Sequence, residues 1–261
     1  DRASARAGQG LQDYKHDDVC AIAATPRQAA DAADVVFMCV GNDDDVRSVA
    51  LGEDGALAGM RAGTVLVDHT TASQQLAVEL ASACAAAGVG FLDAPVSGGQ
   101  AGAENAGLTV MLGGSEADYQ RVEVFLDVYA KKTALMGPVG AGQLTKMVNQ
   151  ICIAGVLQGL AEGVHFAQVA GLDVDAVVDV ISQGAAQSWQ MNNRAATMAV
   201  GEYDFGFAVD WMRKDLGIAL DTGRELNARL PMTALGAQFC ADVQDMGGGR
   251  WDTSSLLRRL S

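Results

Sequence analysis

The sequence predicts an α/β fold with a doubly wound parallel sheet, followed by a domain made only of helices. Short apolar runs alternate with helical segments through the first half of the chain. Beyond Gly142 the apolar residues keep helical spacing, and no further strand is indicated. Because the pattern changes near Pro138 from alternating strands and helices to helices alone, we expect a first domain over residues 1–139 and an all-helical second domain over residues 140–261.

Five apolar runs are predicted to be strands. They are Ala33–Val40, Thr64–Asp68, Gly90–Ala94, Leu108–Leu112 and Thr133–Met136. The first run is continuously apolar, which suits a strand that is buried on both faces. Its expected core residues are Val35, Val36, Phe37 and Val40.

Helical spacing marks six further segments, and the loops between strands and helices are candidate ligand sites. The polar turn Gly41–Asp45 can cap a following helix. The predicted helices are Ser73–Ala87, Glu116–Ala130, Gln143–Val169, Val174–Gln183, Asp210–Asn227 and Thr233–Asp245.

Composition excludes several classes of protein. A net charge of −14 argues against a nucleic-acid or anionic-membrane surface, so local groups must hold any anionic substrate. We see no signal peptide, lipidation motif or apolar run of transmembrane length, and therefore expect a cytoplasmic location. The five cysteines lack the spacing of metal ligands, which indicates reduced packing residues and neither a disulfide framework nor a metal site. They are Cys20, Cys39, Cys84, Cys152 and Cys240.

The stretch Gly140–Gln150 is a glycine-rich entry into a helix. Residues three and four apart are neighbours on a helix, so Lys146 is predicted to lie beside Asn149 and Gln150. A lysine beside a carboxamide suits an acid/base group with its orienting partner. Taken alone, the stretch is equally typical of a surface helix with a solvated lysine.

Two other stretches are candidates. In Asp93–Gly99 (DAPVSGG), a proline and two glycines allow a sharp turn whose N–H groups, with the Ser97 hydroxyl, can hold a carboxylate. An isolated turn of this kind is more often free of ligand. Lys214-Asp215-Leu216 lies in a predicted helix, where a single lysine is usually solvated. His69 follows a strand end and is placed to line a cleft, whereas His16 and His165 offer no catalytic pattern.

The order and the residue identities of these stretches resemble one family, the β-hydroxyacid dehydrogenases. The substrate signature DAPVSGGxxGAxxGxLTxMxGG is matched by DAPVSGGQAGAENAGLTVMLGG at Asp93–Gly114. The glycine-rich GxGxxxK followed by two amides is matched at Gly140–Gln150, and the C-terminal KDL at Lys214–Leu216. The resemblance spans the chain and implies a Rossmann-like first domain with an all-α C-terminal domain.

The resemblance implies a role for each matching residue. Lys146 is expected to be the catalytic acid/base, with Asn149 holding it or the substrate oxygen. Gln150 stands where many members have asparagine and is similar to the tartronate semialdehyde reductase branch; it joins the expected substrate site. The substrate carboxylate is expected on Ser97, Gly98 and Gly99. Asp215 is expected to orient the neighbouring lysines. The NAD or NADP cofactor is expected along Cys39, Val40, Gly41, Asn42, Thr70 and Lys214.

The implied activity is hydride transfer between a small β-hydroxy acid and its semialdehyde, with NAD or NADP and without a metal. A lysine ammonium can stabilise and protonate the developing oxyanion, and burial would lower its pKa enough for the reverse step. Two alternatives are an imine reductase, whose similar fold lacks this lysine, and a catalytically inactive oligomerisation module. We expect a homodimer or homotetramer built through the helical domain.

The family's GxGxxG turn is absent from the sequence. It should lie between a first strand and its helix, and a strand–helix–strand unit takes about 30 residues. We therefore expect a first domain that is incomplete at its N-terminus, and weak cofactor binding by this chain alone. Asp1-Arg2 lies where the second strand would end, and an arginine there would favour the 2′-phosphate of NADP.

Overall fold

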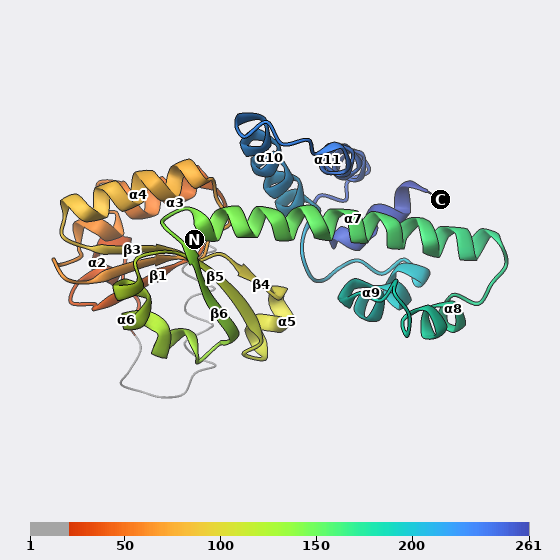
Figure 1. Ribbon diagram of the computed structural model, residues 1–261, viewed down its shortest axis with the longest axis horizontal. Helices are drawn as coiled ribbons and strands as arrows, with labels where there is room; N and C mark the ends of the chain where they lie inside the picture. The colour runs from red at the N-terminus through yellow and green to blue at the C-terminus, as the bar shows by residue number, and fades with distance from the viewer. Residues whose placement is uncertain (1–20, 261) are drawn as a thin grey trace.

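A computed structural model describes residues 21–260, arranged as a sheet covered by helices and a separate group of helices. One long helix, α7, leaves the sheet and runs through the helical part (Figure 1). Residues Asp1, Arg2, His16 and Cys20 lie outside the described range, and so do the expectations attached to them.

The part of the chain before α7 alternates strands with helices. Its elements are α2 (Pro26–Ala30), β1 (Val35–Met38), α3 (Asp43–Leu51), η1 (Ala56–Ala58), β2 (Val65–Asp68), α4 (Gln74–Ala86), β3 (Gly90–Asp93), β4 (Val96–Ser97), α5 (Gly99–Glu104), β5 (Leu108–Gly114), α6 (Glu116–Leu126) and β6 (Ala130–Gly137). The alternation confirms the predicted Rossmann-like α/β arrangement.

The strands form one sheet in the order β1-β2-β3-β5-β4, with β6 paired to β5. Strands β1, β2 and β3 are parallel, β5 is antiparallel to β3, and β6 is parallel to β5. The sequence pattern did not reveal the reversal at β5. Residues 98–107, between β4 and β5, hold only the short helix α5, whereas a crossover to a parallel strand needs about a dozen residues or more.

Strand β1 is shorter and less buried than predicted. Met38 is buried, Val35 and Val36 are half-buried, and the Phe37 side chain is 38% exposed, so the prediction of burial on both faces is wrong. Within the described residues β1 pairs only with β2, so it is the last strand of the sheet on that side and has fewer neighbours.

Both faces of the sheet are covered by helices. Successive residues of a strand point to opposite faces. Leu66 of β2 packs in a cluster with Leu76 of α4, while its neighbours Val65 and Val67 pack in a second cluster with Val122 of α6. Helices α4 and α6 therefore pack on opposite faces of the sheet, which is the arrangement of a doubly wound fold.

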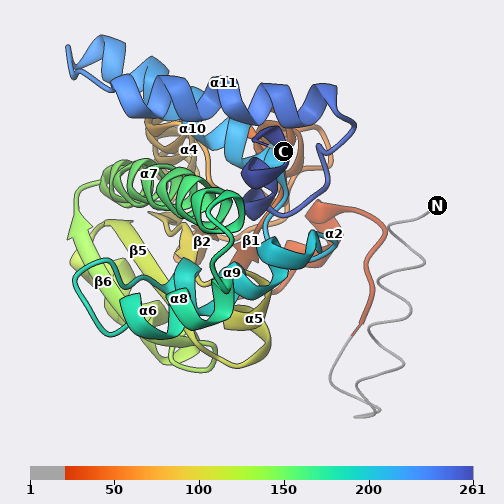
Figure 2. The ribbon, with the colours of Figure 1, turned by 90° about the vertical axis from the view of Figure 1, so that its right-hand side faces the viewer.

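The second part of the structure is helical. It contains α7 (Ala141–Val169), α8 (Val174–Ile181), α9 (Trp189–Val200), α10 (Val209–Glu225), α11 (Pro231–Asp245) and η2 (Thr253–Arg259). Helices α10 and α11 lie on one side of α7, and α8 and α9 on the other (Figures 1 and 2). Helix α9 was not predicted, although Ser188 caps its first turn by accepting from Met191 N at 3.0 Å.

Helix α7 is long and apolar enough, by length and composition, to cross a membrane. Its most apolar 18-residue window has a mean hydropathy of 1.2, so the prediction that no such run exists was too strict. The apolar residues on one side of the helix, among them Leu157, Ala161 and Val164, form the core of the helical part with residues of α9, α10 and α11. This packing accounts for the hydropathy of α7.

Exposure of the cysteines only partly follows the prediction. Cys84 and Cys240 are buried and fill the core, as expected of packing residues, but Cys39 and Cys152 are exposed. Cys39 follows β1, and Cys152 lies on the outer side of α7.

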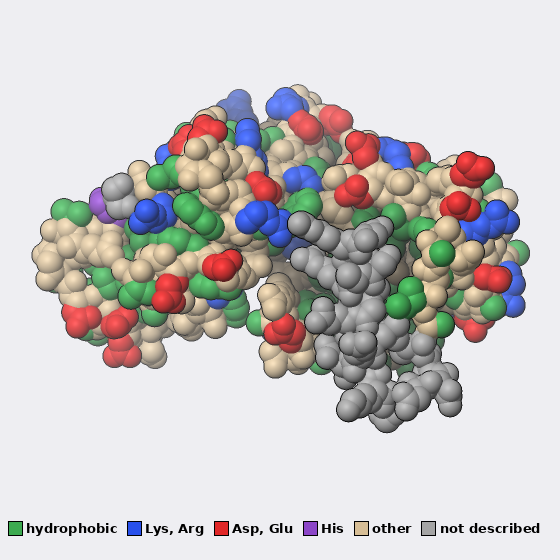
Figure 3. All heavy atoms as spheres, turned by 180° about the vertical axis from the view of Figure 1, so that it is seen from behind, with side chains coloured by type: hydrophobic (Ala, Val, Ile, Leu, Met, Phe, Trp, Pro, Cys, Tyr) green, Lys and Arg blue, Asp and Glu red, His purple; other side chains and the backbone are tan. Residues whose placement is uncertain are grey.

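The surface carries charges of both signs. On the face shown in Figure 3, acidic and basic side chains are interspersed over the sheet part and the helical part. An anionic ligand approaching this face therefore meets no extended positive field, and its binding depends on local groups.

Candidate active site

The candidate site lies where the first turns of α7 meet the carboxyl ends of β2 and β3. Asp93, the last residue of β3, is fully buried and accepts hydrogen bonds from Gly140 N at 2.7 Å and Gln143 N at 2.9 Å. These donors belong to the start of α7, so the carboxylate fixes the helix against the sheet. Burial raises the pKa of Asp93, and the backbone N–H groups oppose that shift.

Lys146 lies on the second turn of α7 and is only 7% exposed. Desolvation lowers its pKa to about 8; the Asp215 carboxylate acts in the opposite direction, and the Lys214 ammonium lowers the pKa further. None of the described residues forms a hydrogen bond with the Lys146 Nζ. The amine is therefore free to exchange a proton with a ligand near neutral pH.

A chain of hydrogen bonds joins the two expected amides to the rest of the site. Asn149 Nδ2 donates to Gln150 Oε1 at 2.7 Å, and Gln150 Nε2 donates to Asp215 Oδ2 at 2.7 Å. Ser97 Oγ lies 3.4 Å from Asn149 Oδ1, across the gap between β4 and α7. Gln150 is 1% exposed and has both ends of its amide engaged, so it stands behind Asn149.

Asp215 and Lys214 connect α10 to the same site. Lys214 Nζ lies 3.0 Å from Asp215 Oδ1 and donates to the Thr71 carbonyl. Burial raises the pKa of Asp215, while Lys214, Lys146 and Gln150 oppose that shift. The carboxylate thus contacts Lys214 directly and interacts electrostatically with Lys146.

The loop after β2 carries Thr70 and is held from several sides. Asp68 Oδ1 accepts from Thr70 N at 2.9 Å, and Thr70 Oγ1 accepts from Val40 N at 3.0 Å. Burial, the largest effect, raises the pKa of Asp68 to about 6. The loops after β1 and β2 are therefore one hydrogen-bonded unit.

The turn Gly41-Asn42 faces the helical part. Asn42 Oδ1 caps α3 by accepting from Asp45 N at 2.9 Å. A Cβ on Gly41 would lie 2.5 Å from Asp45 Oδ2 and 3.1 Å from Trp211 Cη2, so the Trp211 ring packs directly on this turn. Any side chain here would have to displace the Asp45 carboxylate and would press on the Trp211 ring of α10, so glycine suits the position.

The donors in these loops fit a dinucleotide. Thr70 is 1% exposed, and its hydroxyl accepts from Val40 N and bonds the Asp68 carboxylate, so it holds the loop in place. Asn42 Oδ1 is likewise engaged, which leaves the amide N–H groups. With the Lys214 ammonium, these donors suit the hydroxyls and phosphates of a cofactor lying along the strand ends.

The Ser97-Gly98-Gly99 turn has the backbone expected of a nest. Gly98 has φ +135° and Gly99 has φ +61°, values that residues with a side chain rarely adopt. A Cβ on Gly98 would also lie 3.1 Å from the Leu108 side chain. Backbone conformation therefore favours glycine at both positions, and the Leu108 contact adds a tight fit at Gly98 alone.

His69 does not join this network. Its Nδ1 is 2.6 Å from the Ala94 carbonyl and its Nε2 is 2.7 Å from the Tyr129 hydroxyl, so the ring donates at Nδ1 and accepts at Nε2. Burial lowers its pKa, and its ring stacks with Phe37 at 5.7 Å between centroids. Both nitrogens have protein partners, which favours a structural role.

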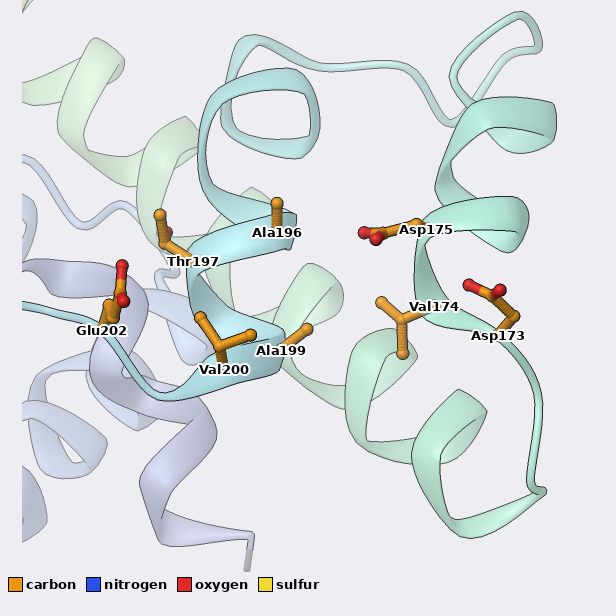
Figure 4. Close-up of a pocket in the computed structure, with 8 residues that line it drawn as sticks. All are labelled: Asp173, Val174, Asp175, Ala196, Thr197, Ala199, Val200 and Glu202. Atoms are coloured by element: carbon orange, nitrogen blue, oxygen red, sulfur yellow. The ribbon is translucent and has the colours of Figure 1, made fainter.

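A hollow of about 360 Å³ lies elsewhere, between α8 and α9 (Figure 4). Its acidic residues are Asp173, Asp175 and Glu202, and Asp173 caps α8 by accepting from Ala176 N at 3.2 Å. None of the predicted site residues lines it.

Three residues at the site had no role assigned from sequence, although each has a visible signal. Asp68 and Asp93 are carboxylates that close an otherwise apolar strand, which places a charge at the ligand edge of the sheet. Gln143 lies one helical turn before Lys146. Its Oε1 accepts from Ala72 N at 3.0 Å and its Nε2 donates to the Thr70 carbonyl at 2.7 Å.

Comparisons with protein families agree with this geometry. Residues 2–137 match the NAD binding domain of 6-phosphogluconate dehydrogenase. Residues 140–260 match the NAD-binding model of NADP-dependent 3-hydroxyisobutyrate dehydrogenase. The cofactor of the family is therefore NAD or NADP.

Individual proteins give the same result. An uncharacterized oxidoreductase of Shewanella frigidimarina is 60% identical over 99% of this chain and 88% of its own length. The crystal structure of 3-hydroxyisobutyrate dehydrogenase from Salmonella typhimurium has a TM-score of 0.84 and 33% identity, covering 92% of this chain and 84% of that one. Psf3 in complex with NADP+ and 2-OPP has a TM-score of 0.85 and 25% identity, with 92% and 84% covered.

An imine reductase from Pseudomonas sp. has a TM-score of 0.55 at 18% identity, covering 98% of this chain and 88% of its own, and shares the fold alone. The two family models together cover most of the chain, and the relatives align along nearly all of it. The chain is a member of the β-hydroxyacid dehydrogenase family of NAD(P)-dependent oxidoreductases.

Proposed function

We propose that this protein interconverts a small β-hydroxy acid and its semialdehyde, with Lys146 as the acid/base. The observation that carries the proposal is a lysine that is 7% exposed, has a pKa lowered to about 8 and lies on the helix turn next to Asn149. In oxidation, neutral Lys146 takes the hydroxyl proton while the carbon–hydrogen bond breaks. In reduction, the Lys146 ammonium donates its proton to the carbonyl oxygen.

The cofactor supplies the redox chemistry: when bound, the nicotinamide accepts or gives the hydride. We propose that Cys39, Val40, Gly41, Asn42, Thr70 and Lys214 hold it. Support comes from the open amide donors of Asn42, from the Thr70 hydroxyl that ties the loops after β1 and β2 together, and from the contact of Lys214 with the Thr71 carbonyl.

The substrate is proposed to lie between the Ser97-Gly98-Gly99 turn and Lys146. The turn offers N–H groups and a hydroxyl for a carboxylate, and Ser97 Oγ is 3.4 Å from Asn149 Oδ1, so one small molecule can reach both. Gln150 is proposed to act on the substrate through Asn149, because its own amide bonds Asn149 and Asp215.

We also propose a division of labour between residues 1–139, which bind the dinucleotide, and residues 140–261, which complete the substrate site. Each side supplies half of the candidate site, with Ser97 and Thr70 before the boundary and Lys146 after it. A cytoplasmic location remains part of the proposal.

The test is turnover of the full-length protein with a panel of small β-hydroxy acids and semialdehydes, each with NAD(H) and NADP(H). Lys146→Met is expected to lower kcat by about 10²- to 10⁴-fold, the usual contribution of a general acid or base. Lys132→Met, at an exposed lysine of β6, is the matched control and should keep full activity.

Near-full turnover by Lys146→Met would exclude the acid/base role. Reduction of imines without activity on hydroxy acids would favour the imine reductase alternative. Cofactor binding without turnover of any substrate would favour the inactive oligomerisation module.

A further inference from the structure

Helix α7 takes its N-terminal cap from another part of the chain. Gly140 occupies the cap position and has no side chain, and no side chain of the helix itself caps it. Instead, the two oxygens of Asp93 accept from Gly140 N and Gln143 N, at 2.7 and 2.9 Å. A single buried carboxylate of the sheet thus sets where the catalytic helix begins.

The helix and the strand approach so closely that only glycine fits between them. A Cβ on Gly142 would lie closest to the Met111 carbonyl oxygen of β5, and 2.7 Å from the Asp93 carbonyl oxygen and 2.8 Å from Asp93 Oδ2. A Cβ on Gly113 of β5 would lie 2.5 Å from Asp93 Oδ1. The hydrogen bonds of Asp93 therefore belong to a close-packed junction, where a small change in the carboxylate must displace the helix.

The same helical turn also holds the loop expected to bind the cofactor. Gln143 is 1% exposed, and its amide joins Ala72 N at 3.0 Å and the Thr70 carbonyl at 2.7 Å. Lys146 follows Gln143 by three residues on α7, and Ser97 follows Asp93 by four along the chain. The junction is therefore adjacent along the chain to the proposed acid/base and to the substrate turn, and it is hydrogen-bonded to the proposed cofactor loop.

We infer that Asp93 and Gln143 are positioning residues: Asp93 sets Lys146 and Asn149 against the Ser97 turn, and Gln143 sets the Thr70 loop against the same helix. The inference rests on the proposed role of Lys146. Neither residue touches the reacting atoms. Their effect is on alignment, to which hydride transfer is sensitive, since a displacement of about 1 Å can cost on the order of 10²-fold in rate.

Asp93→Asn is the most direct test of the positioning role of Asp93. An amide accepts only through its oxygen, so its NH₂ group would face one of the two helix N–H donors and push the first turn of α7 away. In the full-length protein with its best hydroxy-acid substrate, kcat should fall about 10- to 100-fold. The primary deuterium isotope effect on kcat, measured with substrate deuterated at the carbinol carbon, should rise because hydride transfer becomes slower than product release.

Asp252→Asn is the matched control. Asp252 is also a buried carboxylate that bridges two backbone N–H groups, those of Phe207 at 2.9 Å and Ser254 at 3.0 Å, but it lies in the helical part. This variant should lose stability while keeping kcat and the isotope effect of the wild type. If Asp93→Asn behaves like Asp252→Asn, Asp93 serves stability alone and the inference is overturned.

Gln143→Met tests the positioning role of Gln143, and it keeps the backbone N–H group that donates to Asp93. It should raise KM for the cofactor several-fold with a smaller change in kcat, because the Thr70 loop loses both of its bonds to α7. An unchanged KM would refute this half, and the variant carries the test even if Asp93→Asn does not fold. Full activity of Lys146→Met would instead refute the proposed function, so the two failures are distinguishable.

Discussion

At the scale of single residues, the proposed acid/base role of Lys146 makes the rates of the two directions depend on pH in opposite ways. Its pKa of about 8 results from desolvation, with Asp215 raising it and Lys214 lowering it. Below that pH the ammonium form is ready to donate in reduction, and above it the neutral amine is ready to accept in oxidation. The rate of oxidation should therefore rise with pH through about 8, and that of reduction should fall.

Two variants are predicted to move this pH profile in opposite directions. Asp215→Asn removes a negative charge that favours the ammonium, so the oxidative limb of kcat/KM should move to lower pH. Lys214→Gln removes a positive charge, so the limb should move to higher pH. The measurement is kcat/KM for oxidation from pH 6 to about 10, a range that brackets the Lys146 pKa of about 8. Shifts in the same direction for both variants would contradict the assignment of the titration to Lys146.

Sequence spacing could predict some of these residues and not others. Lys146 and Asn149 lie three apart on one helix, so their proximity follows from helix geometry. Ser97 and Asn149 are 52 positions apart, and their approach depends on how α7 docks on the sheet. The turn of Gln150 toward Asp215 depends on the position of α10 and could not be predicted from either stretch alone.

At the scale of elements, the close approach of the first turn of α7 to the sheet is the contact on which we expect stability to depend most. Gly142→Ala would place a Cβ against the Met111 carbonyl oxygen and against the carbonyl and carboxylate oxygens of Asp93, so we predict a loss of about 1–3 kcal/mol in the free energy of unfolding. Gly217→Ala in α10 is the control, since nothing lies within 4 Å of its Cβ position; it should gain about 0.5–1 kcal/mol from helix propensity. Urea unfolding at equilibrium measures both. Equal stability of the two variants would mean that α7 does not depend on this close approach.

The long helices and buried strands were predictable because apolar periodicity is a local property of the chain. The direction of β5 was not, because it depends on which strands the short β4 joins. Helix α9 was missed because its apolar face is sparse: Met191, Ala195 and Met198 are buried among polar residues.

At the scale of the whole molecule, α7 offers an outer face without a partner in the described structure. Along it, Val148 is 60% exposed, Val156 is 40% exposed and Phe166 is 71% exposed. Gly155, Gly159 and Gly163 lie between these residues, and a Cβ on any of them would meet nothing within 4 Å. Helices approach each other closely over small residues, and an exposed apolar face of this kind is typical of an interface.

We therefore predict that the protein is a homodimer or homotetramer assembled through this face of α7. Gly159→Arg should shift the molar mass measured by light scattering toward the monomer. Val124→Arg, at a residue of α6 that is 66% exposed, should leave the mass unchanged. A monomeric wild type at micromolar concentration would refute the prediction, as would a Gly159→Arg protein that assembles like the wild type.

The packing of Trp211 on Gly41 also gives the molecule an optical reporter. Of the three tryptophans, Trp189 stacks on Arg194 and Trp251 lies beside Tyr203, so both sense the helical part, whereas Trp211 touches the turn of the sheet part. Intrinsic fluorescence of the full-length protein should therefore change when the oxidised cofactor, which does not absorb tryptophan emission, is added, and Trp211→Phe should remove most of that change. An undiminished response in Trp211→Phe would show that the signal arises elsewhere. The contact between α10 and the turn after β1 can thus be monitored by the protein's own emission, without an attached label.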